Sequence, residues 1–225
     1  MSIKRLISGG QYGAEVAGLA AAKALGIETG GMAPKGYRTI YGNRPQLQKL
    51  GLIESRSSAY PMRTFDNVKN SDGTIIFAFD TKSRGTMLTM TAIHKFEKPH
   101  LMIDLHEIHE FFIFDVLFWL EDNNIETLNI TGNAGKSKQE STKIFNLVKK
   151  HLIHYIHTNP LHHDIVDDFT TYQYSSFNSH LKTNTTILER NKVIEYFEDK
   201  KNYIFSHHQR ARIILIKNLI KGDEE

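Results

Sequence analysis

Apolar and polar positions alternate in blocks along the first two thirds of the chain. Short, continuous apolar runs have the length of buried strands, and stretches with helical periodicity separate them. This succession indicates a parallel sheet with helices on both faces. The sequence therefore predicts an α/β fold built on a doubly wound parallel sheet. Strands are expected at 3–7, 75–79, 101–103 and 128–130, and helices at 86–97, 107–123 and 137–154.

The pattern changes after about Tyr155. Residues 157–186 are rich in Asn, Thr, Ser, His and aromatic residues and show no clear periodicity. Two helix-like patterns follow, over Ile187–Asp199 and Tyr203–Lys221. We therefore expect a phosphate- or nucleotide-binding sheet domain over residues 1–154. The remainder, 155–225, is expected to form a partly helical C-terminal appendage, for which the sequence indicates no role.

Composition narrows the chemistry that the chain can carry. It has no cysteine, which excludes disulfides, zinc–thiolate sites, iron–sulfur clusters and cysteine nucleophiles, and fits a reducing compartment. No signal peptide is visible, and the most apolar stretch, Phe111 to Leu120, is shorter than the roughly 20 residues that span a bilayer. A net charge of +3 is too small to indicate nucleic acid. We expect a cytoplasmic homo-oligomer that binds neither membranes nor nucleic acid.

Glycine-rich stretches fall where predicted strands run into helices, at 8–13, 80–86 and 131–137. In a parallel sheet these junctions share one edge, and ligands bind there. Gly9, Gly10 and Gly13 allow backbone amides to approach an anion, and the following helix adds its positive end. The alternative is a tight strand–helix turn without a ligand, and three such loops at one edge favour phosphate binding. For Gly85 and Thr86 a helix cap is as good an interpretation.

Two well-known phosphate motifs fit the sequence poorly. A Walker A loop needs two more residues between its glycines than Gly132 and Gly135 have before Lys136 and Ser137. A dinucleotide fingerprint would place Ser8 at its first glycine, and Glu28 precedes the next strand instead of ending it. Neither a P-loop NTPase nor a nicotinamide enzyme is therefore expected.

Several stretches, taken together and in order, resemble the family known as the putative molybdenum carriers. This family is a branch of the Rossmann-like superfamily that includes the LOG nucleotide phosphoribohydrolases. The resemblance covers roughly residues 3–150 and implies a Rossmann-like fold. The stretches are Gly9–Glu15, Gly30–Arg38, Arg63–Thr74, Gly85–Thr89 and, more weakly, Leu128–Gly132 with Ser137 and Lys138.

The resemblance also implies a ligand and a set of residues around it. The ligand would be a phosphorylated nucleotide-like or pterin-like molecule at the carboxyl edge of the sheet, such as the molybdenum cofactor or a nucleotide. The sequence departs from the family's pattern at Tyr12, Glu15, Val16 and Arg84, all in the expected pocket, so the ligand can differ. The expected binding residues are Gly9, Gly10, Gln11, Tyr12, Gly13, Lys35, Arg38, Arg63, Asn67, Arg84, Gly85 and Thr86.

The residues leave open whether the protein is also an enzyme. In the LOG enzymes a glutamate of the glycine-threonine loop serves glycosidic cleavage, and Thr89 stands at that place here. Threonine is no general acid or base at neutral pH, so binding is favoured over catalysis. Glu15 is the carboxylate that could replace the glutamate. The alternatives are a nucleotide N-glycosidase and a protein that senses or sequesters a nucleotide signal.

Other polar residues have a structural as well as a functional interpretation. Lys35 and Arg38 follow a Gly-Gly-x-x-Pro loop and are expected to face the same cleft as Gly10, where they could bind a phosphate or carboxylate. Arg63 and Asn67 can share one helix face. Asp72 is expected to be a turn residue.

The 12 histidines raise the question of a metal site. His151, His154 and His157 are spaced along one predicted helix, and His162, His163 and Asp164 follow. Without cysteine or an H-E-x-x-H pattern we interpret them as surface histidines and expect no metal. His207 and His208, with Arg210 and Arg212, are expected to form a solvated basic patch on the last helix.

Overall fold

The chain divides into two compact units, Met1–Lys149 and Lys150–Glu225, here called the N-terminal and C-terminal units. Each is considered by itself. The computed structural model describes residues 3–106, 112–133, 142, 144–146, 148–149, 153–154, 156–158, 161, 165–173, 175–183 and 190–209.

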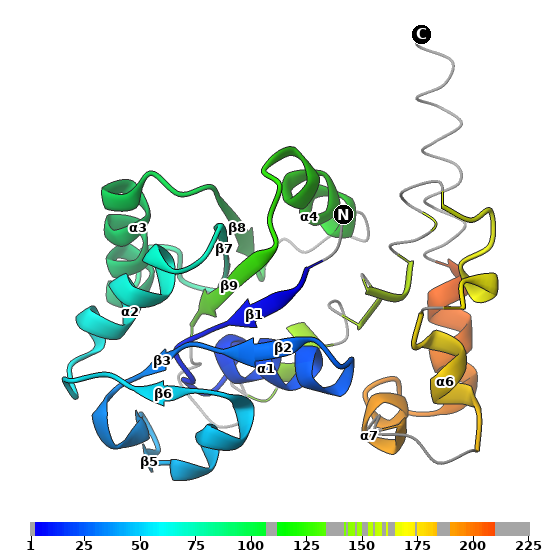
Figure 1. Ribbon diagram of the computed structural model, residues 1–225, viewed down its shortest axis with the longest axis horizontal. Helices are drawn as coiled ribbons and strands as arrows, with labels where there is room; N and C mark the ends of the chain where they lie inside the picture. The colour runs from blue at the N-terminus through cyan, green and yellow to red at the C-terminus, as the bar shows by residue number, and fades with distance from the viewer. Residues whose placement is uncertain are drawn as a thin grey trace, which may run out of the picture. The chain divides into compact units, whose positions relative to one another are not determined.

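A sheet of five parallel strands forms the centre of the N-terminal unit (Figure 1). Its spatial order is β2-β1-β9-β7-β8. The predicted doubly wound α/β fold is therefore confirmed, and the predicted strands all lie in this sheet. The strands are β1 (Arg5–Ile7), β2 (Glu28–Gly30), β7 (Gly73–Ala78), β8 (His100–Asp104) and β9 (Thr127–Gly132).

The strand order is a rotated form of a common doubly wound arrangement. Counted along the chain from β7 through β8 and β9, and then from β1 to β2, the strands lie in the order 2-1-3-4-5. In that arrangement the strand order reverses between the first and third strands, which here are β7 and β9. Ligands bind in the crevice beyond the carboxyl ends of those two strands. The topology thus selects one place at the sheet edge.

Helices cover both faces of this sheet. Ile130 of β9 packs against Gly18 of α1, where an added Cβ would meet the isoleucine at 2.9 Å. Trp119 of α4 lies against Gly73 of β7, on the same face. On the other face α2 and α3 pack together over Ile76 (Figure 1). The helices are α1 (Ala14–Ala24), α2 (Tyr60–Lys69), α3 (Arg84–Phe96) and α4 (Phe112–Asp122).

Between β2 and α2 the chain forms short elements around the sheet edge. Two small ladders occur there, a parallel pair of β3 with β6 and an antiparallel pair of β4 with β5. Asn67 of α2 fixes β3, because its side-chain oxygen accepts from Met32 N at 2.7 Å and its Nδ2 donates to Met32 O at 3.1 Å. The elements are β3 (Met32–Ala33), η1 (Lys35–Tyr37), β4 (Arg38–Thr39), β5 (Gly42–Asn43), η2 (Pro45–Leu50) and β6 (Ile53–Glu54).

Two sequence expectations can be compared directly with local geometry. Asp72 is a turn residue, as expected: its Oδ2 accepts from Thr127 N at 2.7 Å and from Glu126 N at 3.1 Å, which fixes the start of β9. The helix expected from residue 86 begins two residues earlier, at Arg84, because Ser83 provides its N-cap. Residues 107–111, and most of the helix expected over 137–154, lie outside the described residues.

The C-terminal unit is helical in its described part. It contains η3 (Phe169–Thr171), α6 (Phe177–Leu181), α7 (Arg190–Glu195) and a helix over 200–209 (Figure 1). None of the helices in the described part of the chain has both the length and the apolar character needed to span a bilayer.

The expectation of surface histidines is wrong for this unit. His154, His157 and His207 are all buried, so His207 does not belong to a solvated patch, whereas His208 is exposed. These imidazoles pack with buried aromatic rings and form part of the core. His151, His162, His163, Asp164, Arg210 and Arg212 lie outside the described residues. Within the described residues, no three or more His, Cys, Asp or Glu side chains are arranged to hold a metal ion.

Candidate functional site

A cavity of about 630 Å³ opens at the carboxyl ends of β7 and β9. Phe79 and Asp80, which follow β7, line one side, and Gly132 and Asn133, at the end of β9, line another. Ligand pockets in proteins commonly measure about 300–1,000 Å³. The cavity therefore has the size of a small-molecule site and lies at the switch point that the topology selects.

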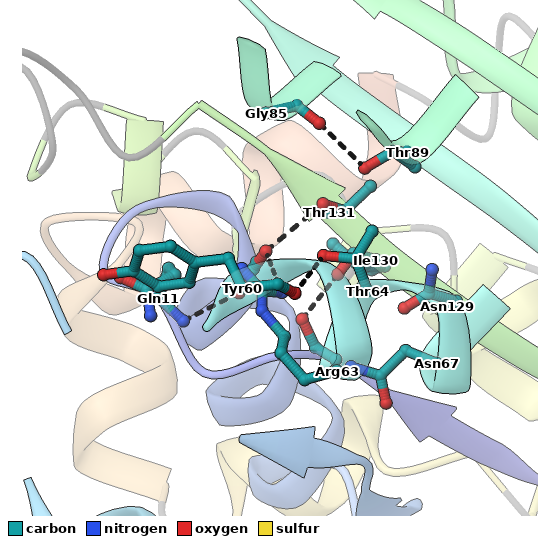
Figure 2. A network of polar contacts seen from close by, with 12 residues as sticks. Gln11, Tyr60, Arg63, Thr64, Asn67, Gly85, Thr89, Asn129, Ile130 and Thr131 are labelled. Carbon is teal, nitrogen blue, oxygen red and sulfur yellow. Dashed lines mark hydrogen bonds and ion pairs between the residues drawn. The ribbon is translucent and has the colours of Figure 1, made fainter. Parts of the chain in front are cut away.

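A buried ion pair forms one wall of the cavity (Figure 2). Arg63 Nη1 of α2 lies 2.9 Å from Glu15 Oε1 of α1, and the two side chains are only 9% and 3% exposed. Thr131 of β9 donates its hydroxyl proton to the same Oε1 at 3.2 Å, and Gln11 N donates to Oε2 at 2.7 Å. A buried charge is tolerated when it is paired and hydrogen-bonded, and Glu15 meets both conditions.

The same contacts change the interpretation of the first glycine loop. The carboxylate of Glu15, in the first turn of α1, accepts the amide proton of Gln11 and offsets the positive end of that helix. Gly9 has no room for a side chain, because an added Cβ would overlap the guanidinium of Arg63. Gly10 has φ +78°, and its Cβ position points at Leu47 and Leu52. Gly9 thus makes room for the ion pair of Arg63 and Glu15, and Gly10 makes room for the two leucine side chains.

The N-terminus of α3 forms a second wall, and here the backbone is accessible. Ser83 caps the helix by accepting from Thr86 N at 3.2 Å, and Asn133 Nδ2 donates to Ser83 Oγ at 3.1 Å. Arg84 and Gly85 are the first helical residues and line the cavity. Among the described residues, and apart from Gly85's own helical turn, no atom lies within 4 Å of a Cβ added at Gly85. A 13-residue helix thus presents its positive end to the cavity beside a guanidinium.

Apolar and aromatic groups line much of the remaining wall. Ile40, Tyr60 and Pro61 line it, as do Phe79 and His106, whose ring centroids are 5.0 Å apart. Gln11 fixes the segment that carries Ile40, because its Oε1 accepts from Ile40 N at 3.2 Å and its Nε2 donates to Arg38 O at 2.9 Å. Flat apolar surfaces beside a few polar groups suit a planar heterocycle.

Four of the residues expected from the sequence line the cavity: Gln11, Arg63, Arg84 and Gly85. Gly9 lies directly behind the ion pair, and Gly13 is the N-cap residue of α1.

The other expected residues do not line the cavity. Lys35 and Arg38 are exposed and are not among the described residues that line the cavity. Tyr12 packs against Tyr41 and Phe145. The side-chain amide of Asn67 is hydrogen-bonded to the backbone of Met32, and the hydroxyl of Thr86 lies 2.9 Å from that of Ser83.

Sequence reasoning missed several residues of the cavity. Asp80, His106 and Asn133 each stand one or two residues beyond the end of a strand, and that position was a usable signal. Thr131 lies within the stretch 131–137 that the sequence indicated, at the end of β9, but was not singled out. Tyr60 carried no such signal, because it reaches the cavity through the packing of α2 on the sheet. Glu15 was expected only if the protein were an enzyme, and the structure makes it part of the wall.

Comparison with known proteins agrees with this architecture. Residues 6–155 match the model of the circularly permutated YpsA SLOG family. The chain belongs to this family. Its structure is similar to the crystal structure of "Putative molybdenum carrier protein" from Syntrophus aciditrophicus SB, with 34% identity and a TM-score of 0.60. That match covers 68% of this chain and 94% of the other. No curated protein sequence matches this chain.

The permutation in the SLOG family's name agrees with the rotated strand order, in which β7 takes the place of a first strand. In this SLOG protein the hydroxyl of Thr89 donates to Gly85 O at 3.2 Å, inside the first turns of α3. Among the described residues that line the cavity, Glu15 and Asp80 carry carboxylates.

Proposed function

We propose that the N-terminal unit binds a phosphorylated nucleotide-like or pterin-like small molecule in the cavity between β7 and β9. The phosphate lies against the first turn of α3, beside Arg84 and over Gly85, and the ring lies among the apolar and aromatic residues. The observation that supports this most is the N-terminus of α3, which opens into the cavity with no side chain on Gly85. This arrangement binds anions through backbone amides and the helix dipole.

The similar solved protein is named a molybdenum carrier, and the molybdenum cofactor, a phosphorylated pterin, is one ligand expected from the sequence. The cavity fits the phosphate end of such a molecule at the start of α3, beside Arg84 and Gly85. The chain has no cysteine to supply a thiolate ligand. A molybdenum-bearing pterin would therefore be held through its phosphate and ring. A nucleotide monophosphate fits the same groups.

Substitution of Gly85 separates binding from folding. Gly85→Asp places a carboxylate at the positive end of α3, which favours the helix but repels a phosphate. We expect unchanged or slightly higher thermal stability and a loss of affinity of about 10- to 100-fold, the value of one charge-assisted bond. Gly85→Ala, which meets no atom, is the matched control. Calorimetric titration with AMP, adenosine and a pterin monophosphate measures the effect. Equal binding by Gly85→Asp and Gly85→Ala would refute the phosphate site, and so would equal binding of AMP and adenosine.

A nucleotide N-glycosidase is the second candidate, because Glu15 lines the cavity. Both of its oxygens already accept hydrogen bonds, and one is paired with Arg63, so it is poorly placed to transfer a proton. We therefore expect that the protein releases no adenine from AMP. Chromatography of the incubated mixture measures this. Turnover near 1 s⁻¹ is in the ordinary enzymatic range. It would establish an enzyme if it is lost in Glu15→Gln while Trp119 fluorescence shows this variant still folded, and kept in Asp80→Asn.

Binding without turnover would fit a carrier and equally a protein that sequesters a nucleotide signal. The two are distinguished by what co-purifies with the protein, which native mass spectrometry identifies. The same spectra determine whether the chain forms the expected homo-oligomer.

A further inference from the structure

Four histidines of the C-terminal unit meet in its core. His157 and His207 have no exposed surface, and His154 and His180 are 3% and 4% exposed. The ring centroids of His154 and His207 are 4.4 Å apart, those of His157 and His207 are 5.0 Å apart, and those of His157 and His180 are 5.4 Å apart. Phe177, Phe197 and Tyr203 pack around them. We call these four residues the histidine cluster.

The hydrogen bonds of the cluster determine which ring nitrogens carry protons. His207 Nδ1 lies 2.7 Å from Tyr203 O, and because a carbonyl only accepts, this nitrogen carries the proton. In neutral His207 the other nitrogen, Nε2, is then an acceptor, and His157 Nδ1 donates to it at 3.0 Å. His157 Nε2 is left as the acceptor of the Ser176 hydroxyl at 2.8 Å. The network is complete with both imidazoles neutral.

A further proton in this network would be hydrogen-bonded but cut off from water. His157 Nε2–H can donate it to the Ser176 hydroxyl, yet neither His157 nor His207 has any exposed surface, so the charged ring would lose its hydration. His180 is enclosed by the rings of His157 and Tyr203, and neither of its nitrogens has a hydrogen-bond partner among the described residues. An imidazolium there would lose its hydration without compensation.

The surrounding charges do not favour protonation. Arg190 of α7 acts on His180 and, with burial as the larger cause, lowers the pKa of His180 to about 4. Burial, followed by His207 and His180, holds the pKa of His157 well below its usual 6.5. Burial also raises the pKa of Tyr203, so the phenol stays neutral.

A carboxylate beside the cluster would favour protonation of the imidazoles. The carboxylates of this unit's described residues all belong to exposed residues. The charged groups on the elements around the cluster are Asp167 and Asp168 before η3, Lys182 after α6, Arg190, Lys192 and Glu195 of α7, Glu198 and Asp199 before the last helix, and Lys200, Lys201 and His208 in it.

We propose that the histidine cluster makes the C-terminal unit a proton-sensitive module, which is folded while its buried imidazoles are neutral and opens on acidification. The unfolded chain binds protons at His157 and His180 more tightly than the folded unit does. The unit is therefore most stable above about pH 6.5 and loses stability as the pH falls toward 4. Each such histidine raises the unfolding equilibrium constant by up to about tenfold per pH unit.

Hydrogen exchange tests this on the full chain. Protection of peptides from 175–183 and 190–209 is measured by mass spectrometry between pH 7.5 and 4.5, corrected for the intrinsic pH dependence of exchange. We expect a fall of at least about tenfold per pH unit below about pH 6. Fluorescence of Trp119, the single tryptophan, reports the N-terminal unit and should stay constant where this loss begins. Constant protection down to pH 4.5, or simultaneous loss in both units, would overturn the proposal.

Two substitutions identify the protons responsible. His180→Phe removes a protonation site without removing a hydrogen bond, so protection should depend less steeply on pH, by up to about tenfold per unit. His208→Gln changes an exposed histidine on the last helix and should leave the dependence unchanged. Equal slopes for the two variants would contradict the role of the cluster. If His180→Phe lacks protection at pH 7.5, NMR titration of the imidazoles in the unaltered chain decides, and protonation of His157 at or above pH 6.5 would refute the proposal.

Discussion

Glu15 is the residue at which three distant segments of the N-terminal unit meet. Its partners Arg63 and Thr131 are 48 and 116 positions away in the sequence, and its third bond returns to Gln11 at the start of its own helix. Removing one partner of a buried ion pair leaves the other charged and without compensation. The pair therefore matters to the fold of this edge as well as to the charge of the cavity.

We expect Glu15→Gln to lower the free energy of unfolding by about 3–5 kcal/mol, the usual effect of breaking a buried pair. Urea unfolding followed by Trp119 fluorescence measures it. Glu126→Gln is the matched control, because its ion pair with Lys4, at 2.7 Å, is exposed and should contribute no more than about 1 kcal/mol. A similar small effect for both variants would show that Arg63 finds other partners.

Two glycine-to-alanine substitutions should have opposite signs. Gly9→Ala places a methyl group on the Arg63 guanidinium and should cost about 1–3 kcal/mol, as overpacking does. Gly85→Ala adds a methyl group in open space within a helix and should stabilise by up to about 1 kcal/mol. Thermal unfolding of the two variants and of the unaltered chain measures both effects. Destabilisation by both would mean that the first turn of α3 is more crowded than its geometry indicates.

At the scale of elements, the start of α3 depends on one hydroxyl. Ser83 Oγ accepts from Thr86 N and from Asn133 Nδ2, so it caps the helix and joins it to the loop after β9. Ser83→Ala should destabilise by about 1 kcal/mol and weaken ligand binding, because the first turn is then less well ordered. Lys82→Ala, at the exposed preceding residue, should change neither. An undiminished affinity in Ser83→Ala would separate the cap from the binding site.

Strands and helices were more predictable from the sequence than the site. The apolar run 75–79 and the helix after it follow from local periodicity, and the glycine-rich junctions indicated the sheet edge at which the cavity opens. The Glu15–Arg63 pair could not be predicted, because it depends on how α1 and α2 pack on opposite faces of the sheet. Lys35 and Arg38 stay a prediction from their loop position, and they are not among the described residues that line the cavity. His154 and His157 are spaced along one predicted helix, but the sequence could not show that this face packs against buried aromatic rings.

At the scale of the whole molecule, the comparisons and the fold separate the two units. The family match ends at residue 155, and the 68% of this chain that matches the solved neighbour makes up 94% of that protein. A domain of this kind therefore exists with almost no additional chain. The described residues that line the cavity are numbered 11–133, and the histidine cluster comprises residues between 154 and 207. The proposed binding and the proposed proton sensitivity thus belong to different units of one chain.

A fragment of residues 1–155 should accordingly fold and bind by itself. Its sheet, its flanking helices α1 to α4 and every residue of the cavity are retained, and the solved neighbour is a precedent for such a length. We expect the Trp119 unfolding transition and the affinity for AMP to match those of the full chain within about threefold, a free-energy difference below about 1 kcal/mol. The fragment should lack the steep loss of hydrogen-exchange protection below pH 6. A fragment that folds but binds more than about tenfold more weakly would show that the C-terminal unit contributes to the site.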